Sequence, residues 1–168
     1  MRIRPEGPRD HGAVRAVHTA AFGSAAEADL VDALRATPAW VPEFSLVAEL
    51  DGGIVGHVLL TRVDVSGEWG LGLAPVGVLP CRQRRGVGSA LVRAVLEAAA
   101  TAGERLVVVL GDPAYYGRFG FVAASRYGVT CSYQVPDEVF QALPLPTYDG
   151  APRGLVRYSE PFSALGEP

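Results

Sequence analysis

The stretch Gln83-Arg84-Arg85-Gly86-Val87-Gly88-Ser89 decides the fold of this chain, because it joins an apolar run to a helical pattern. The apolar run covers residues 71–78, and the helical pattern extends over residues 87–102. A strand that ends in a glycine-bearing loop and opens a helix directs several backbone N–H groups at one point, where the helix dipole adds partial positive charge. Glycine carries no Cβ, so a ligand can approach the backbone closely. The pattern predicts a site for a phosphate or pyrophosphate.

The length and composition of the chain favour one globular domain over residues 1–168. No apolar stretch approaches the ~20 residues of a membrane span, and the first residues lack the apolar segment of a secretory signal. We therefore expect a cytoplasmic protein that binds no membrane.

A net charge of −3 argues against a nucleic-acid partner. Cys81 and Cys131 form no metal-ligand pattern, so no metal is expected. We interpret Cys81 as a small residue of the loop rather than as a nucleophile that forms an acyl-cysteine intermediate.

Strand and helix patterns continue on both sides of the opening stretch. Before it we expect an edge strand at residues 2–4, helices after Asp10 and Ser24, and strands at 44–50 and 54–65. After it we expect a buried strand at 106–110, a short helix from Pro113, strands at 121–129 and 130–133, a helical turn near 137–143 and a last strand at 154–158. This order predicts an α/β fold, with a mixed, mostly antiparallel sheet and helices on both faces.

Two motifs resemble those of a known family. Residues 78–91, Val-Leu-Pro-Cys-Arg-Gln-Arg-Arg-Gly-Val-Gly-Ser-Ala-Leu, resemble motif A of the GCN5-related N-acetyltransferases (GNAT), whose core is Gln/Arg-x-x-Gly-x-Gly/Ala. Residues 114–121, Ala-Tyr-Tyr-Gly-Arg-Phe-Gly-Phe, resemble motif B and follow at the family's spacing of one helix and one strand. The chain is most similar to a bacterial subgroup with a Gly-Asp-Pro-x-Tyr-Tyr-x-Arg-Phe-Gly-Phe segment. The likeness covers about residues 1–130 and leaves 131–168 as a C-terminal extension.

The resemblance implies a GNAT-like sheet whose central strand pair is splayed, with acetyl-CoA as co-substrate in the gap. Val76, Gly77 and Val78 are then expected to pair with the pantetheine arm, and backbone amides from Arg84 to Ser89 to hold the pyrophosphate. The side chains of Arg84 and Arg85 either assist that contact or are solvated loop charges. The full expected cofactor-binding set is Val76, Gly77, Val78, Gln83, Arg84, Arg85, Gly86, Val87, Gly88 and Ser89.

The second motif supplies a candidate catalytic acid. By resemblance, Tyr116 is the tyrosine that protonates the departing CoA thiolate. A phenol of pKa about 10 is protonated at neutral pH, and a positioned acid typically contributes ~10²–10⁴-fold to the rate. The alternative is that Tyr116 only packs, or that the adjacent Tyr115 takes its place. Tyr115, Phe119 and Phe121 are otherwise expected in the core.

A lysine-like acceptor amine of pKa about 10.4 must lose a proton before it attacks, at a cost of about 4 kcal/mol near neutral pH. The candidate bases are Glu27, His57 and Asp112. Each has a structural alternative: Glu27 completes a Ser24-x-x-Glu27 capping box, His57 is a half-buried strand residue, and Asp112 caps the helix that starts at Pro113. The resemblance does not decide between them.

The predicted function is transfer of an acetyl group from acetyl-CoA to an amine by direct attack. The alternative is a non-catalytic acyl-CoA-binding or sensing module, which needs the glycine loop but not Tyr116. A P-loop is set aside because the chain contains no lysine, and a Rossmann site because Leu91 stands where its third glycine would be.

The acceptor is expected to be a small-molecule amine or a peptide N-terminus, and the resemblance allows a homodimer. The acidic residues Glu27, Asp29 and Asp32 either attract a cationic acceptor or form a solvated helix face.

Overall fold

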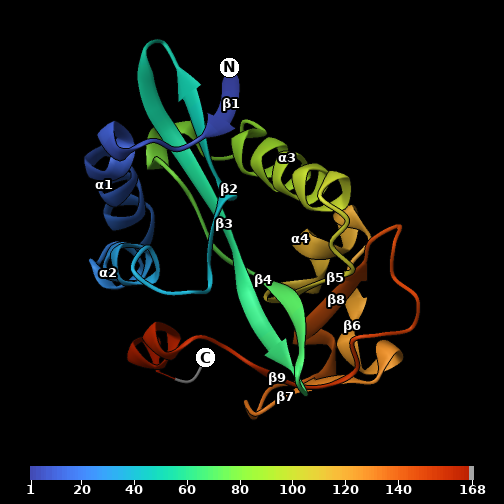
Figure 1. Ribbon diagram of the computed structural model, residues 1–168. Coiled ribbons are helices and arrows are strands. Elements are labelled where there is room, and N and C mark those ends of the chain that lie inside the picture. The colour runs from blue at the N-terminus through green and yellow to red at the C-terminus, as the bar shows by residue number, and fades with distance from the viewer. Residues whose placement is uncertain (167–168) are drawn as a thin grey trace.

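The computed structural model describes residues 1–166 and shows one nine-stranded sheet with helices on both faces (Figure 1). The strands are β1 (Arg2–Pro5), β2 (Trp40–Leu50), β3 (Gly53–Val65), β4 (Glu68–Val78), β5 (Leu106–Leu110), β6 (Val122–Ala123), β7 (Val129–Cys131), β8 (Phe140–Pro144) and β9 (Gly154–Arg157). The α-helices are α1 (His11–Phe22), α2 (Ala26–Leu34), α3 (Val87–Thr101) and α4 (Pro113–Tyr116). Short 3₁₀ turns include η1 (Pro8–Asp10), η2 (Pro80–Arg82), η3 (Gly117–Phe119), η4 (Ala124–Tyr127), η5 (Asp137–Val139) and η6 (Glu160–Leu165).

The sheet has the order β1-β2-β3-β4-β5-β8-β6, and β9 pairs with both β3 and β7. Two neighbouring pairs are parallel, β4 with β5 and β7 with β9, and the others are antiparallel. The predicted class, a mixed and mostly antiparallel α/β sheet, is confirmed. Within residues 1–166, no helix is both long and apolar enough to cross a membrane.

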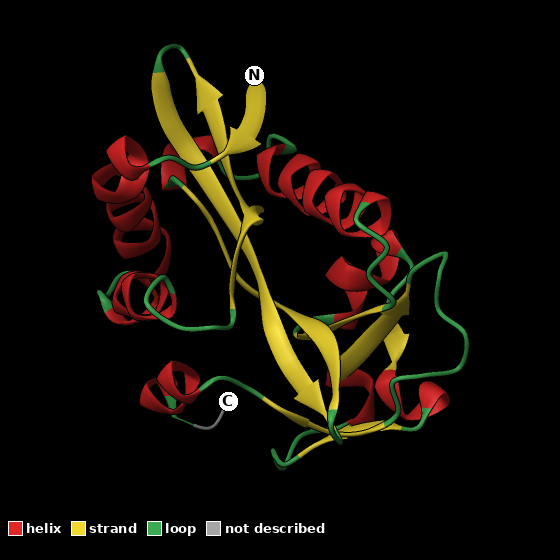
Figure 2. Ribbon diagram, viewed as in Figure 1, coloured by secondary structure: helices red, strands yellow, loops and turns green. Residues whose placement is uncertain are grey.

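β4 and β5 separate soon after they meet. Their register consists of Leu71 opposite Val107 and Gly72 opposite Val108, whereas β4 continues to Val78. β4 also contains a β-bulge, because it places three residue steps between Leu73 and Val76 where β3 has two. The outer part of β4 therefore presents its β5-facing edge to a wedge rather than to a neighbouring strand (Figure 2).

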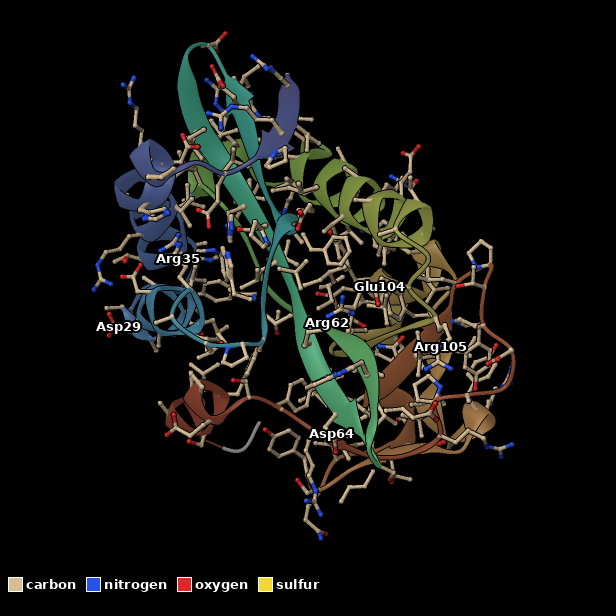
Figure 3. All side chains as sticks on the ribbon, viewed as in Figure 1. Asp29, Arg35, Arg62, Asp64, Glu104 and Arg105 are labelled. Atoms are coloured by element: carbon tan, nitrogen blue, oxygen red, sulfur yellow. The ribbon has the colours of Figure 1, made fainter. Side chains whose placement is uncertain are left out.

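Successive side chains on the central strands point to opposite faces of the sheet and pack against the helices on each face. Leu46 and Leu60 pack into a cluster with Leu91 and Val95 of α3, while Val47 and Leu59 pack with residues of α1 and α2. This alternation is the period-two pattern of a strand that is buried on both faces. An ion pair of 2.6 Å between Arg62 of β3 and Glu104 ties the chain after α3 to the sheet (Figure 3).

The sequence-based expectations fail mainly between residues 121 and 144. The strand expected at 121–129 is reduced to β6, and the 3₁₀ turn η4 follows it. The turn expected near 137–143 is limited to η5, and β8 follows at Phe140. β8 pairs along all of β5, from Leu106 opposite Pro144 to Leu110 opposite Phe140. β8 pairs with the edge of β5 that lies opposite β4, and local propensity does not reveal such long-range pairing.

The C-terminal turn η6 packs against α2. Phe162 is 7% exposed and lies in one cluster with Leu30, Val31 and Leu34 of that helix. We expect Phe162→Ala to lower the free energy of unfolding by about 2–3 kcal/mol, the transfer free energy of a buried phenyl group. Urea denaturation of the two proteins measures the difference. Leu165→Ala is the control, because Leu165 is 39% exposed and its loss should change stability by less than about 0.5 kcal/mol. Equal losses in both variants would contradict this docking.

Candidate functional site

A cavity of about 640 Å³ lies where β4 ends, beside the N-terminus of α3 and the α4 turn. Four segments that are distant in sequence line it: the end of α1, the outer part of β4, the loop into α3, and α4 with the turn after it. The lining residues are Ala21, Phe22, Val76, Val78, Gln83, Arg84, Gly86, Gly88, Ser89, Tyr115, Tyr116 and Arg118.

The loop into α3 leaves backbone donors free toward this cavity. Gly86 is the N-cap in a left-handed conformation (φ 83°), and its carbonyl accepts the amide of Ala90 at 3.0 Å. The amides of the three intervening residues, 87–89, have no partner within the helix, as is general for a helical first turn. The Gln83 side chain donates to the Val78 carbonyl at 3.0 Å and so holds the loop against β4.

Gly88 fits its place for a steric reason. A Cβ there would lie 3.1 Å from the Tyr115 hydroxyl and 3.6 Å from Cγ2 of Val78, inside the cavity. Any side chain at this position would therefore fill the space in front of the free amides.

The structure brings together most of the residues predicted to bind the cofactor. Val76, Val78, Gln83, Arg84, Gly86, Gly88 and Ser89 line the cavity, as does Tyr116. Three predicted residues are not among those that line the cavity, although the backbone of Gly77 and Val87 remains beside it. Gly77 lies between the two valines and faces α1, Val87 is buried in the core with α3, and Arg85 is exposed outside the lining. Cys81 is exposed and likewise outside the lining.

Phe22, Tyr115 and Arg118 also line the cavity, although none of them was in the expected cofactor-binding set. Tyr115 was expected in the core, but its ring faces the cavity beside Gly88. The Arg118 guanidinium stacks on that ring, 4.4 Å from its centroid, and its Nε donates to the Tyr115 carbonyl at 3.2 Å. The position of Arg118 inside the second motif was the available signal.

Tyr116 lines the cavity and is half-buried. Its ring packs edge-on against Tyr115 and Phe121, with centroids 4.9 and 5.8 Å apart. A Cβ at Gly111 would overlap the Tyr116 ring, so glycine there makes room for it. Burial, with a smaller contribution from Tyr115, raises the pKa of Tyr116 to about 12. The phenol is therefore protonated throughout the neutral range.

The three candidate bases differ in their surroundings. Asp112 accepts the amide of Ala114 at 2.9 Å and so caps α4. Glu27 does not complete a capping box, because α2 starts at Ala26 with Ala25 as its N-cap, and one of its carboxylate oxygens is buried without a partner among residues 1–166. His57 is fully buried rather than half-buried. None of the three lines the cavity.

A second cavity of about 290 Å³ borders the inner part of β4. Its lining is apolar and aromatic: Leu73, Ala74, Leu110, Tyr133, Tyr158, Phe162, Leu165 and Gly166. No acidic residue is among the described residues that line it. On α2, Asp29 and Asp32 bind Arg15 at 2.7 Å each, so these carboxylates are paired on the helix surface.

A sheet that splays beside a glycine-opened helix, with an aromatic turn across the gap, is the acetyltransferase architecture that the two motifs implied. The chain belongs to the acetyltransferase (GNAT) family, whose sequence profile matches residues 13–121. It is 37% identical to the uncharacterized N-acetyltransferase YhbS of Escherichia coli K12, over 97% of this chain and 99% of that protein. It is 40% identical to the uncharacterized N-acetyltransferase YjhQ of the same organism, over 77% of this chain and 74% of that protein.

Solved structures agree with this assignment. The crystal structure of E. coli YhbS in complex with CoA superposes with a TM-score of 0.90 at 36% identity, covering 99% of this chain and 93% of that one. A GNAT family acetyltransferase from Brucella melitensis in complex with acetyl-CoA gives a TM-score of 0.80 at 39% identity, covering 96% of this chain and 97% of that one.

Proposed function

We propose that the protein transfers an acetyl group from acetyl-CoA to an amine by direct attack of the amine on the thioester. The observation that carries this proposal is the wedge after Gly72, where the unpaired edge of β4 leads to the free amides of α3. The CoA and acetyl-CoA complexes of two similar proteins support it.

The outer part of β4 binds the pantetheine arm in this proposal. Its backbone from Val76 to Val78 adds the arm as an extra strand at the open edge, a known mode of recognition for extended ligands. The amides of residues 87–89 hold the pyrophosphate, and Arg84 and Arg118 add positive charge at the cavity wall. Gln83 positions the loop through its bond to Val78, and Gly86 and Gly88 leave space for the phosphates.

Tyr116 acts on the departing sulfur. Acetyl-CoA supplies an activated acyl group and a thiolate leaving group. With its pKa raised to about 12, the Tyr116 phenol offers a proton in a hydrogen bond at every assay pH near neutrality. Complete proton transfer to a thiolate of pKa about 8.5 is uphill, so stabilisation of negative charge on sulfur as the C–S bond breaks carries most of the effect.

The acceptor amine enters from the second cavity. β4 borders both cavities, with Val76 and Val78 in the first and Leu73 and Ala74 in the second, so both lie beside the same strand. The apolar and aromatic lining favours an amine on an apolar body, either a small molecule or a peptide N-terminus, over a polycation.

We also infer one cytoplasmic domain over residues 1–168. Homodimer formation stays a prediction that sedimentation equilibrium tests.

The decisive experiment combines calorimetry with an amine panel. We expect acetyl-CoA to bind with a Kd in the micromolar range, near the usual KM of enzymes, and at least one apolar amine to release free thiol from it. No heat of binding at about millimolar acetyl-CoA would contradict the proposal at its root. Binding without thiol release by any amine would favour the non-catalytic acyl-CoA-binding module.

A further inference from the structure

A chain of buried hydrogen bonds runs across the α1 and α2 face of the sheet. His18 of α1 and His57 of β3 are fully buried, and Nε2 of His18 lies 2.8 Å from Nδ1 of His57. Nε2 of His57 lies 2.8 Å from the hydroxyl of Ser45, which is also fully buried. The Ser45 hydroxyl lies 2.9 Å from the Glu6 carboxylate.

The direction of every bond in this chain follows from its Glu6 end. Two Arg35 nitrogens donate to the Glu6 carboxylate at 3.1 and 2.9 Å, so the oxygens of Glu6 act as acceptors in this cluster. Ser45 therefore donates to Glu6 and accepts from Nε2–H of His57. A neutral His57 then has a bare Nδ1, which accepts from Nε2–H of His18. A neutral His18 is left with an unprotonated Nδ1.

Burial keeps both rings neutral, with smaller contributions from His18 at His57 and from the charge of Arg35 at both rings. Burial is the larger cause for each, and it lowers the pKa of His18 to about 4 and the pKa of His57 well below its ordinary value. The charged groups around the dyad are Arg35 and Glu6, with Asp32 bound to Arg35 farther out (Figure 3 labels Arg35 beside α1 and α2). At neutral pH the bare Nδ1 of His18 is thus a lone pair and not a proton donor.

That lone pair lies at the strand that lines the cofactor cavity. Nδ1 of His18 is buried and has no hydrogen-bond partner within residues 1–166. It faces Gly77, where a Cβ would come within 2.6 Å of it, and Gly77 lies between the cavity-lining Val76 and Val78. Phe22, one helical turn onward, stacks on the His18 ring with centroids 5.9 Å apart, is 44% exposed and lines the same cavity. Phe22 therefore contacts both the imidazole and the cavity, and this exposed ring must rotate for an amine to reach His18.

The far end of the chain reaches a different part of the surface. Glu6 and Arg35 line a hollow of about 270 Å³ between the β1–α1 connection and Trp40. The hydrogen-bonded chain therefore links the neighbourhood of the cofactor cavity to a separate opening.

The geometry points to His18 as the base that takes the proton of the acceptor amine, with His57, Ser45 and Glu6 as a relay that carries the proton to the second hollow. This assignment rests on the proposed function. The amine N–H bond breaks as a proton binds Nδ1 of His18. His18 then passes its Nε2 proton to His57, His57 passes its own to Ser45, and Ser45 passes its own to Glu6. Glu6 releases one proton to water in the hollow, and the chain carries no net charge change once the tautomers are restored.

The tautomers can be read directly, without an acceptor. The chain has three histidines, so nitrogen-15 labelling of histidine gives a spectrum of three rings. We expect His18 and His57 each to carry a proton on Nε2 and none on Nδ1 from about pH 6 to 8. Ser45→Ala should shift the His57 Nε2 signal. Thr61→Val is the matched control, because Thr61 is an equally buried hydroxyl on β3 outside the chain, and it should leave the signals in place. A proton on Nδ1 of His18, or a charged ring, overturns the assignment.

Kinetics test the role of the relay with two probe amines. 2-Phenylethylamine is protonated at neutral pH, whereas aniline is not. With 2-phenylethylamine at about pH 7 we expect His18→Gln to lower kcat about 100-fold and Ser45→Ala about tenfold, with Ser45→Thr restoring most of the rate. Both deficits should shrink toward about twofold near pH 9.5, where more of the amine is free base, and with aniline at any pH.

A deficit that is equal for both amines and independent of pH means a structural role only, and overturns the relay. If the unaltered protein turns over neither probe, an alkylamine and an arylamine that the panel identifies replace them. Turnover of no amine in the panel contradicts the proposed function instead, while the spectra still decide the tautomers on which the relay depends.

Discussion

Replacing Tyr116 with phenylalanine lowers kcat by about 100- to 1,000-fold and leaves the Kd for acetyl-CoA within about twofold, because the ring packing stays and one donor to the sulfur is lost. The phenyl ring keeps its contacts with Phe121 and the space that Gly111 leaves for it. Stopped-flow thiol release gives kcat, and calorimetry gives the affinity. Since burial raises the pKa of Tyr116 to about 12, the unaltered enzyme should show no loss of rate from phenol ionisation below about pH 10.

Tyr115→Phe is the matched control for this prediction. Both tyrosines line the cavity on the same short helix, but the Tyr115 hydroxyl is beside Gly88, at the mouth of the phosphate loop. Its loss should change kcat by less than about threefold. A large loss in Tyr115→Phe together with a small one in Tyr116→Phe would move the acid by one residue and contradict the assignment.

Gly88→Leu should weaken acetyl-CoA binding by about 100-fold or more. The new side chain fills the space in front of the helix amides, and the loss of two charge-assisted hydrogen bonds is worth about 3–6 kcal/mol. Gly88 lies in the first turn of α3 with a negative φ, so the substitution brings no left-handed strain. Calorimetric titration with acetyl-CoA and with CoA measures the effect.

The control for Gly88→Leu is Gly12→Leu in α1, where a Cβ meets nothing within 4 Å. Both variants should keep the thermal stability of the parent within about 1 kcal/mol, and Gly12→Leu should bind acetyl-CoA normally. Normal binding by Gly88→Leu would show that the phosphates lie elsewhere.

Local signals were sufficient to predict the centre of the fold. The strand, loop and helix of residues 71–102 carry an apolar run, the loop glycines Gly86 and Gly88, and a helical apolar face, and each signal is contained within a few neighbouring residues. The C-terminal third was predicted less well. β8 exists because β5 needs a partner about 30 residues away in sequence, and the Pro-rich composition around it favours turns.

The site divides in the same way. Motif residues such as Gly86, Gly88 and Tyr116 could be named, because the glycine loop and the resemblance to two family motifs pointed to them, and all three line the cavity. The His18–His57–Ser45–Glu6 chain could not, since its four members come from α1, β3, β2 and the segment after β1. His57 was a candidate base, but only the sheet register and the packing of α1 show that His18 faces β4 instead.

The second cavity draws Tyr158 and Phe162 from the end of the chain, whereas residues 76–89 and 115–118, with Ala21 and Phe22, build the first. If the second cavity receives the acceptor, as proposed, then part of the surface that selects the amine is separate in sequence from the residues that bind the acyl donor. We then expect relatives to change the amines they accept by substitutions in the tail, without loss of acetyl-CoA binding. A divergent C-terminus beside unchanged glycine and tyrosine motifs is the pattern that this arrangement leads us to expect among paralogues.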